Sequence, residues 1–193
     1  MGVWDTLRKS DRNRTRLEQM YEDAYALCNS PTRQNETLGP KERQRVEMGV
    51  ACEQIANGTG EFGRTVTNPI PVNGLFGAWT YLSRLRWMQT GSKVFFHQLR
   101  QEGSIMVFAL INRSGTWQDT LYVDPYHPYA SRHRPKGYML EKEFVFPRGV
   151  TTHIVAFPQG LYRYIQQEAK RRLGIALADE EGKYIQVEKT TYP

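Results

Sequence analysis

The feature that most constrains this chain is a run of short apolar segments between residues 77 and 124, each bounded by turn-forming residues. The segments are Gly77–Trp87, Lys93–Arg100, Ile105–Asn112 and Thr116–Asp124, and their separators are residues 89–91, 102–103 and 113–115. Parallel strands need a crossover of about a dozen residues or more, so connections this short predict an antiparallel meander. Within it, Ile105–Ile111 is nearly all apolar, which predicts a central strand.

The first of these segments has a second interpretation. Leu75, Trp79, Leu82 and Leu85 recur at a spacing that also fits one face of a helix. Both a strand and a helix therefore stay open over this stretch.

The N-terminal part predicts two helices. The first runs from about Ser10 to Cys28, and the second from Gly39-Pro40 to about Ala56, where Val46, Val50 and Ile55 would be buried. Cys28 and Cys52 fall on the expected apolar faces, where a reduced cysteine acts as a small core residue. Residues 58–77, rich in Gly and Pro, form a connection, and Val66–Asn73 is expected to be a short edge strand because Pro is confined to such edges.

The C-terminal part predicts further strands and one helix. Strands are expected at about Tyr138–Phe146 and Thr151–Phe157, then a helix from Pro158 to Gly174 and a terminal hairpin over residues 175–188. The whole is an α+β fold: two N-terminal helices, a mainly antiparallel meander sheet of about five to seven strands, one C-terminal helix and a hairpin. We expect a single domain, 1–193, with a helical part (1–57), a connection (58–77) and a sheet with its helix (78–193).

Charge and composition bound the partners. The chain of 193 residues has a formal net charge of +6, which favours anionic partners such as nucleic acid or an acidic protein. No stretch approaches the roughly 20 apolar residues that span a bilayer, and residues 1–20 have no signal-peptide run, so we expect a cytoplasmic protein. Gly58, Gly60 and Gly63 match a dinucleotide-binding spacing, but a helix precedes them instead of a strand, so no cofactor is expected.

Residues 125–137 form the most unusual segment, a 13-residue loop of mixed cationic and aromatic residues. Long loops of this kind inside a compact domain are often functional. Cations contact phosphates and aromatic faces stack on unpaired bases, which favours a non-catalytic binding module for nucleic acid or a protein-interaction subunit of a larger assembly. The residues expected to contact the partner are Tyr126, Tyr129, Arg132, Arg134, Lys136 and Tyr138, with Arg171 and Arg172 from the C-terminal helix.

The same loop has an enzymatic alternative: a small hydrolase or transferase acting on a phosphate-bearing substrate. His127 or His133 would be the acid or base, Asp124 its orienting partner, and Arg132 the anion clamp. The two hypotheses differ in geometry, since an enzyme requires these side chains to converge in a concave pocket. The spacing of the histidines matches no metal-ligand pattern, so no metal is expected.

Overall fold

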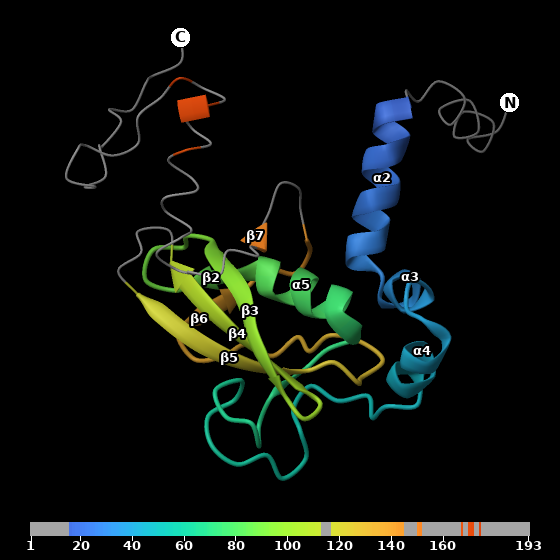
Figure 1. The fold of residues 1–193 in the computed structure, drawn as a ribbon, viewed down its shortest axis with the longest axis vertical. Helices are drawn as coiled ribbons and strands as arrows, with labels where there is room; N and C mark the ends of the chain where they lie inside the picture. The colour runs from blue at the N-terminus through green and yellow to red at the C-terminus, as the bar shows by residue number, and fades with distance from the viewer. Residues whose placement is uncertain are drawn as a thin grey trace, which may run out of the picture. The chain divides into compact units, whose positions relative to one another are not determined.

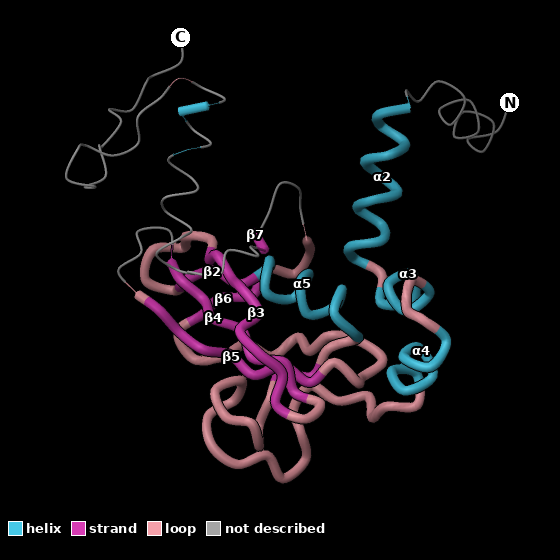
Figure 2. Tube along the Cα trace, viewed as in Figure 1, coloured by secondary structure: helices cyan, strands magenta, loops and turns pink. Residues whose placement is uncertain are grey.

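A computed structural model describes residues 16–112, 117–144, 150–151 and the single positions 167, 170, 171 and 174. The chain forms two compact units, residues 1–151 and 152–193. The first unit holds all the labelled helices and strands (Figures 1 and 2). The expected C-terminal helix has only four described positions, and the terminal hairpin lies outside the described residues.

Three helices open the described chain: α2 (Arg16–Asn29), α3 (Pro31–Glu36) and α4 (Pro40–Glu47). The first predicted helix corresponds to α2. The Ser30 side chain caps α3 by accepting a hydrogen bond from the Arg33 amide at 3.3 Å, and Pro31 occupies the first turn, where a missing N–H has no cost. This short helix lies between the two helices that the sequence predicts.

The second predicted helix is too long at its C-terminal end, because α4 stops at Glu47 instead of reaching Ala56. The carbonyls of Val50 and Glu53 accept hydrogen bonds from side chains of the 125–137 loop, at 2.7 Å each, and this extended path replaces helical pairing. Val46 is buried as expected, but Val50 is 72% exposed. Cys52 accordingly lies in this extended segment and not on a helix face.

The next segment resolves the open alternative at residues 77–87. Strand β1 (Ile70–Pro71) is followed by helix α5 (Gly74–Arg84), and strand β2 (Leu85–Trp87) begins where the helix ends. The helical interpretation is therefore right for most of this stretch. The expected edge strand is confirmed as β1, which contains Pro71 and lies at one edge of the main sheet.

The main sheet has the strand order β1-β5-β4-β3-β7. Strands β3 (Val94–Glu102), β4 (Ile105–Asn112) and β5 (Gln118–Asp124) form the predicted antiparallel meander, with a bulge in β3 near Leu99. Strand β4 lies at its centre, as predicted. The two-residue strands β1 and β7 (Val150–Thr151) pair in parallel with β5 and β3.

A second sheet pairs β2 with β6 (Tyr138–Leu140). The mixed α+β content is confirmed, whereas the arrangement differs from one continuous meander. The strand predicted at Tyr138–Phe146 is shortened to β6. This strand pairs with β2, which follows α5, and not with the meander. Of the expected strand at 151–157, only Thr151 is described, within β7.

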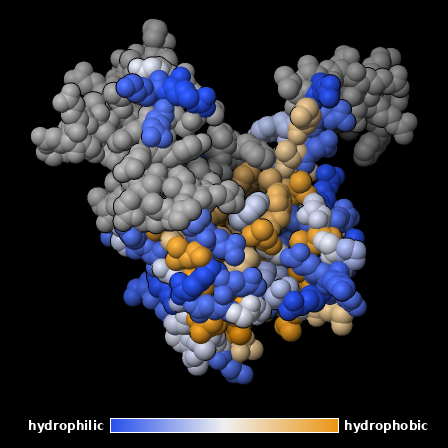
Figure 3. Space-filling view, in the orientation of Figure 1, coloured by the Kyte–Doolittle hydropathy of each residue, from blue (hydrophilic) through white to orange (hydrophobic). Residues whose placement is uncertain are grey.

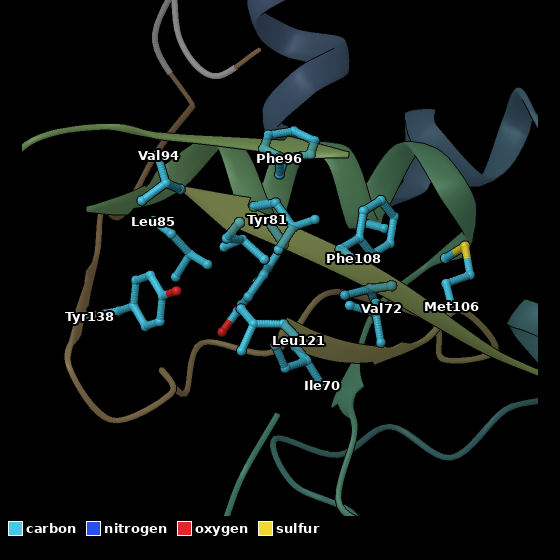
Figure 4. Close-up of a cluster of buried hydrophobic side chains, with 14 of the residues drawn as sticks. Ile70, Val72, Tyr81, Leu85, Val94, Phe96, Met106, Phe108, Leu121 and Tyr138 are labelled. Atoms are coloured by element: carbon cyan, nitrogen blue, oxygen red, sulfur yellow. The ribbon is translucent and has the colours of Figure 1, made fainter. Parts of the chain in front are cut away.

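The hydrophobic core lies between α5 and one face of the meander (Figure 4). Tyr81 of α5, Phe96 of β3 and Phe108 of β4 are almost completely buried within it, and Phe96 and Phe108 make an edge-to-face contact with centroids 6.2 Å apart. Tyr138 of β6 and Ile70 of β1 close the same cluster. Burial of this cluster fixes α5 on the sheet and so fixes the segments at both ends of the helix.

The surface mixes residue types in small groups on the face shown in Figure 3. Among the described residues, Met48 and Val50 are the most exposed large hydrophobic residues, at 77% and 72%. Within the described residues, no helix has the length and apolar character that crossing a bilayer requires.

Substitution of Gly49 tests the path of the chain after α4. A Cβ added there would lie 2.0 Å from the Tyr126 carbonyl oxygen, so Gly49→Ala must push two backbone segments apart. We expect a loss of about 3 kcal/mol in the free energy of unfolding, measured by urea denaturation. Gly39→Ala is the control, because its Cβ would meet nothing within 4 Å; it should cost less than about 1 kcal/mol. Equal stability of the two variants would refute the close approach of residues 49 and 126.

Candidate functional site

Hydrogen bonds hold the loop of residues 125–137 against the rest of the first unit along most of its length. The His127 amide donates to the Val72 carbonyl at 3.1 Å, and the Ser131 amide donates to the Pro71 carbonyl at 2.8 Å. The Tyr81 hydroxyl donates to the His133 carbonyl at 2.7 Å, which joins the loop to α5. The segment predicted to be without regular structure is therefore held by main-chain hydrogen bonds over much of its course.

The C-terminal end of the loop is held by Arg64. Its guanidinium donates to the Asp119 carboxylate at 2.8 Å and to the Lys136 carbonyl at 2.8 Å. Asp119 also accepts a hydrogen bond from the Tyr138 hydroxyl at 3.1 Å. The charged pair joins the Gly-rich connection to β5, and Arg64 also binds the loop. Together these contacts fix the position of the C-terminal end of the loop.

Asp124 and His127 lie together, as the enzymatic hypothesis expected. His127 is 6% exposed; its Nε2 lies 3.2 Å from Asp124 Oδ2, and its Nδ1 lies 2.7 Å from the Val50 carbonyl oxygen. A carbonyl only accepts, so Nδ1 carries a proton. Nε2 is buried at ion-pair distance from the Asp124 carboxylate without a hydrogen-bond partner, so the two groups attract one another when His127 is protonated.

The environment of His127 acts on its pKa in two directions. Burial lowers the pKa, but the interactions with Asp124 and with the Val50 carbonyl outweigh it and raise the pKa above the ordinary histidine value. Cys52 Sγ lies 3.6 Å from Nδ1, and burial together with Asp124 and Glu53 raises the pKa of this thiol. Since Cys52 and Asp124 contact opposite ring nitrogens, they do not converge on one point as metal ligands would, and no metal-binding group occurs among the described residues.

Arg132 does not join this pair. Its Nε donates to Glu53 Oε1 at 2.9 Å, and its amide donates to Glu53 Oε2, while the Arg132 side chain stays 82% exposed. Burial raises the pKa of Glu53, but these hydrogen bonds outweigh burial and lower it. Three of the four residues of the enzymatic hypothesis are thus split, with Asp124 and His127 in one cluster and Arg132 in another.

His133 lies apart from the Asp124 pair as well. It is exposed, and its ring makes an edge contact with Phe62 at a centroid distance of 4.8 Å. Arg134 and Lys136 are also exposed, beyond His133 in the loop. These three residues and Arg132 line a hollow of about 390 Å³, together with Met88 and Tyr138. Its lining contains four basic side chains and no carboxylate.

The three tyrosines expected to stack on bases lie in different environments. Tyr138 is completely buried and packs edge-on against Trp87 and Trp117, so its ring has no face open to a ligand. The Arg45 guanidinium covers the Tyr126 ring at 3.7 Å from its centroid. Tyr129 is partly exposed and lines a second, larger hollow. Arg171 is exposed within the second unit, and Arg172 lies outside the described residues.

The buried histidine predicts a specific pH dependence. Because the pKa of His127 is raised in the folded state, its stabilisation is complete below the unfolded value of about 6.5 and is lost as pH rises through the folded pKa. The stability difference between the wild type and His127→Gln should therefore shrink as pH rises above about 6.5, as measured by urea unfolding.

His133→Gln is the matched control for this experiment, since it removes an exposed histidine from the same loop. It should retain the wild-type pH dependence. A difference between wild type and His127→Gln that grows with pH would contradict a raised pKa of His127 in the folded state.

Sequence reasoning missed Glu53, Arg64 and Cys52 as members of this surface. The sequence pattern predicts a helix over Cys52 and Glu53 and a connection over Arg64, with no functional role for the three residues. A carboxylate or a cation gives no local signal of a partner about 55 to 80 residues away in the chain, as the pairs Arg64–Asp119 and Glu53–Arg132 require. No family model matches the chain, and the comparisons with curated proteins and with solved structures also found no match.

Proposed function

We propose that the protein is a non-catalytic binding module that holds a nucleic-acid backbone against the loop of residues 125–137, called the basic loop below. The observation that carries the proposal is the hollow of about 390 Å³ lined by Arg132, His133, Arg134 and Lys136 without a carboxylate. Phosphate groups are the anions that arginine and lysine side chains bind on nucleic acids, and their contacts do not depend on sequence.

The way in which the loop is held supports this proposal. Binding is weakened by the entropy of ordering a mobile segment. Here the main chain is already fixed at Ser131, His133 and Lys136 by hydrogen bonds to Pro71, Tyr81 and Arg64. The partner therefore orders only exposed side chains, so a modest number of phosphate contacts can give measurable affinity.

The tyrosines refine the expected ligand. Stacking on unpaired bases requires open aromatic faces. Tyr138 is buried and Arg45 covers one face of Tyr126, which leaves the partly exposed Tyr129 as the best placed of the three candidates. We therefore expect electrostatic binding to the backbone with little preference for single strands over duplex. A partner with a dense row of phosphates fits this surface better than one recognised by its bases.

The enzymatic alternative has one observation in its favour, the contact between Asp124 and His127. Nδ1 of His127 is bound to the Val50 carbonyl, however, and Nε2 is buried beside the Asp124 carboxylate, so neither ring nitrogen is open to a substrate. Arg132 pairs with Glu53 instead of serving the same point. The binding hypothesis is therefore preferred.

A salt series tests the proposal. Three phosphate contacts from Arg132, Arg134 and Lys136 predict that the logarithm of the association constant for a fluorescent 20-base-pair DNA falls with the logarithm of salt concentration with a slope near −3. Fluorescence anisotropy between 25 and 200 mM NaCl measures this slope. The double variant Arg134→Gln/Lys136→Gln should weaken binding at least tenfold at 50 mM NaCl and reduce the slope to about −1.

The control variant is Arg16→Gln/Lys41→Gln, which removes the same net charge from exposed positions on α2 and α4. It should change binding by less than threefold. Equal losses in the two double variants would show that only net charge matters, and the absence of binding at 25 mM NaCl would refute the proposal.

A further inference from the structure

A second hollow, of about 700 Å³, lies beside the C-terminal half of α5. Its wall combines the end of α2, helix α3, the last turns of α5, residues 128–132 of the loop and residues 142–143. Helix α3 and the end of α2 lie next to α5 in Figure 1. The volume falls in the range of sites that enclose small organic ligands.

Arg84 is the unusual residue of this wall. Its Nη1 donates to the Lys142 carbonyl at 3.1 Å, and its guanidinium lies 5.8 Å from the centroid of the Tyr81 ring. Its Nε is buried and has no hydrogen-bond partner, and none of the ion pairs among the described residues includes Arg84. Desolvation lowers the pKa of Arg84, because partial burial disfavours the charged form.

The position of Arg84 is fixed by the fold. The residue ends α5, its carbonyl accepts a hydrogen bond from the Glu141 amide at 3.0 Å, and β2 begins at the next residue. The antiparallel pairing of β2 with β6 therefore holds the base of this side chain at the hollow. A partly buried cation in a fixed position, with no ion-pair partner among the described residues, is destabilising unless it has a function or a ligand.

The rest of the wall indicates what such a ligand would contain. Lys142 and Arg132 add two exposed cations, and the one carboxylate of the wall, Glu143, accepts a hydrogen bond from the Tyr25 hydroxyl. Pro128, Tyr129 and Ala130 supply an apolar and aromatic side. An anionic group beside Arg84 and a flat organic group against Tyr129 would satisfy both parts of the wall.

We propose that this hollow is a binding site for a phosphate monoester, with the phosphate on Arg84 and the organic group against Tyr129. Two sources share this chemistry: a free mononucleotide and the 5′-phosphorylated end of a nucleic acid. Arg132 lines both this hollow and the smaller one, so an end phosphate held here would lead the following backbone towards the basic loop. The free-ligand case is independent of the proposed function.

Isothermal titration calorimetry of the full chain with adenosine monophosphate and with adenosine tests the proposal. Adenosine monophosphate should bind at least tenfold more tightly than adenosine at 50 mM NaCl. Arg84→Gln should abolish that preference, and Lys142→Gln should weaken it by a few-fold. Circular dichroism and urea unfolding of Arg84→Gln test whether the variant is folded. If it is unfolded, Lys142→Gln and Arg84→Lys test the proposal instead. Arg84→Lys keeps the charge but loses the planar guanidinium.

The variant Arg134→Gln/Lys136→Gln separates this proposal from the one on the basic loop. It should bind adenosine monophosphate like the wild type, within twofold, while it loses affinity for duplex DNA. A 20-nucleotide strand with a 5′-phosphate and the same strand with a 5′-hydroxyl then distinguish the two sources. Tighter binding of the phosphorylated strand, dependent on Arg84, identifies the nucleic-acid end, whereas equal binding of the two strands identifies the free monoester.

Two results would overturn the proposal. One is equal binding, or no binding up to 5 mM, of adenosine monophosphate and adenosine by the wild type together with equal affinity for the two strands. The other is a folded Arg84→Gln variant that keeps the wild-type preference for the phosphorylated ligand.

Discussion

The first unit depends on the backbone pairing of one short segment, Ile70–Asn73. All four residues are buried, and three of them are completely inaccessible to solvent. On one side the Val72 amide donates to the Asp124 carbonyl at the end of β5; on the other, the Pro71 and Val72 carbonyls accept from loop amides. Buried main-chain groups must find partners, so the loop is required to complete this segment and cannot leave it without exposing unpaired carbonyls.

Asn73 extends the same constraint to the helices. Its side-chain amide donates to Gln34 at 2.9 Å and to Asn35 at 3.0 Å, and Asn35 in turn donates to the Pro128 carbonyl at 3.1 Å. The N-terminal helices, the sheet edge, α5 and the loop therefore meet around one buried amide cluster. In the low dielectric of the interior these hydrogen bonds are strong, and partial loss of the cluster is costly.

This arrangement explains how a surface of like charges can persist beside a core. The loop cations are exposed and repel one another. The main chain that carries them is nevertheless held in place by hydrogen bonds to Pro71, Tyr81 and Arg64. Arg132 lies between the two hollows and is balanced by Glu53. The smaller hollow offers a row of exposed cations, and the larger one offers the partly buried Arg84 guanidinium beside an aromatic side, so the two suit different parts of a phosphate-bearing ligand.

The sequence predicts those features that depend on neighbouring residues. The apolar run Ile105–Ile111 and its short turns identify the central strand, and Pro71 identifies an edge strand. The end of α4 could not be predicted, because residues 48–56 carry a helical pattern that is overridden by hydrogen bonds from His127 and Ser131, more than 70 residues later. Arg84 likewise looks like one more surface cation, since its burial results from α5 and β6 meeting in space. Tyr138 is likewise predicted at the surface, because its burial also results from elements that are distant in the sequence and meet in space.

Hydrogen exchange at two amides tests the central claim that the loop is a paired part of the fold. The amides of His127 and Ser131 donate to the Val72 and Pro71 carbonyls. We predict that both exchange with solvent deuterium at least a hundredfold more slowly than an unstructured peptide of the same sequence, close to the amides of β4 and β5. Exchange of these two amides at the unstructured rate, with β4 and β5 protected, would contradict the account.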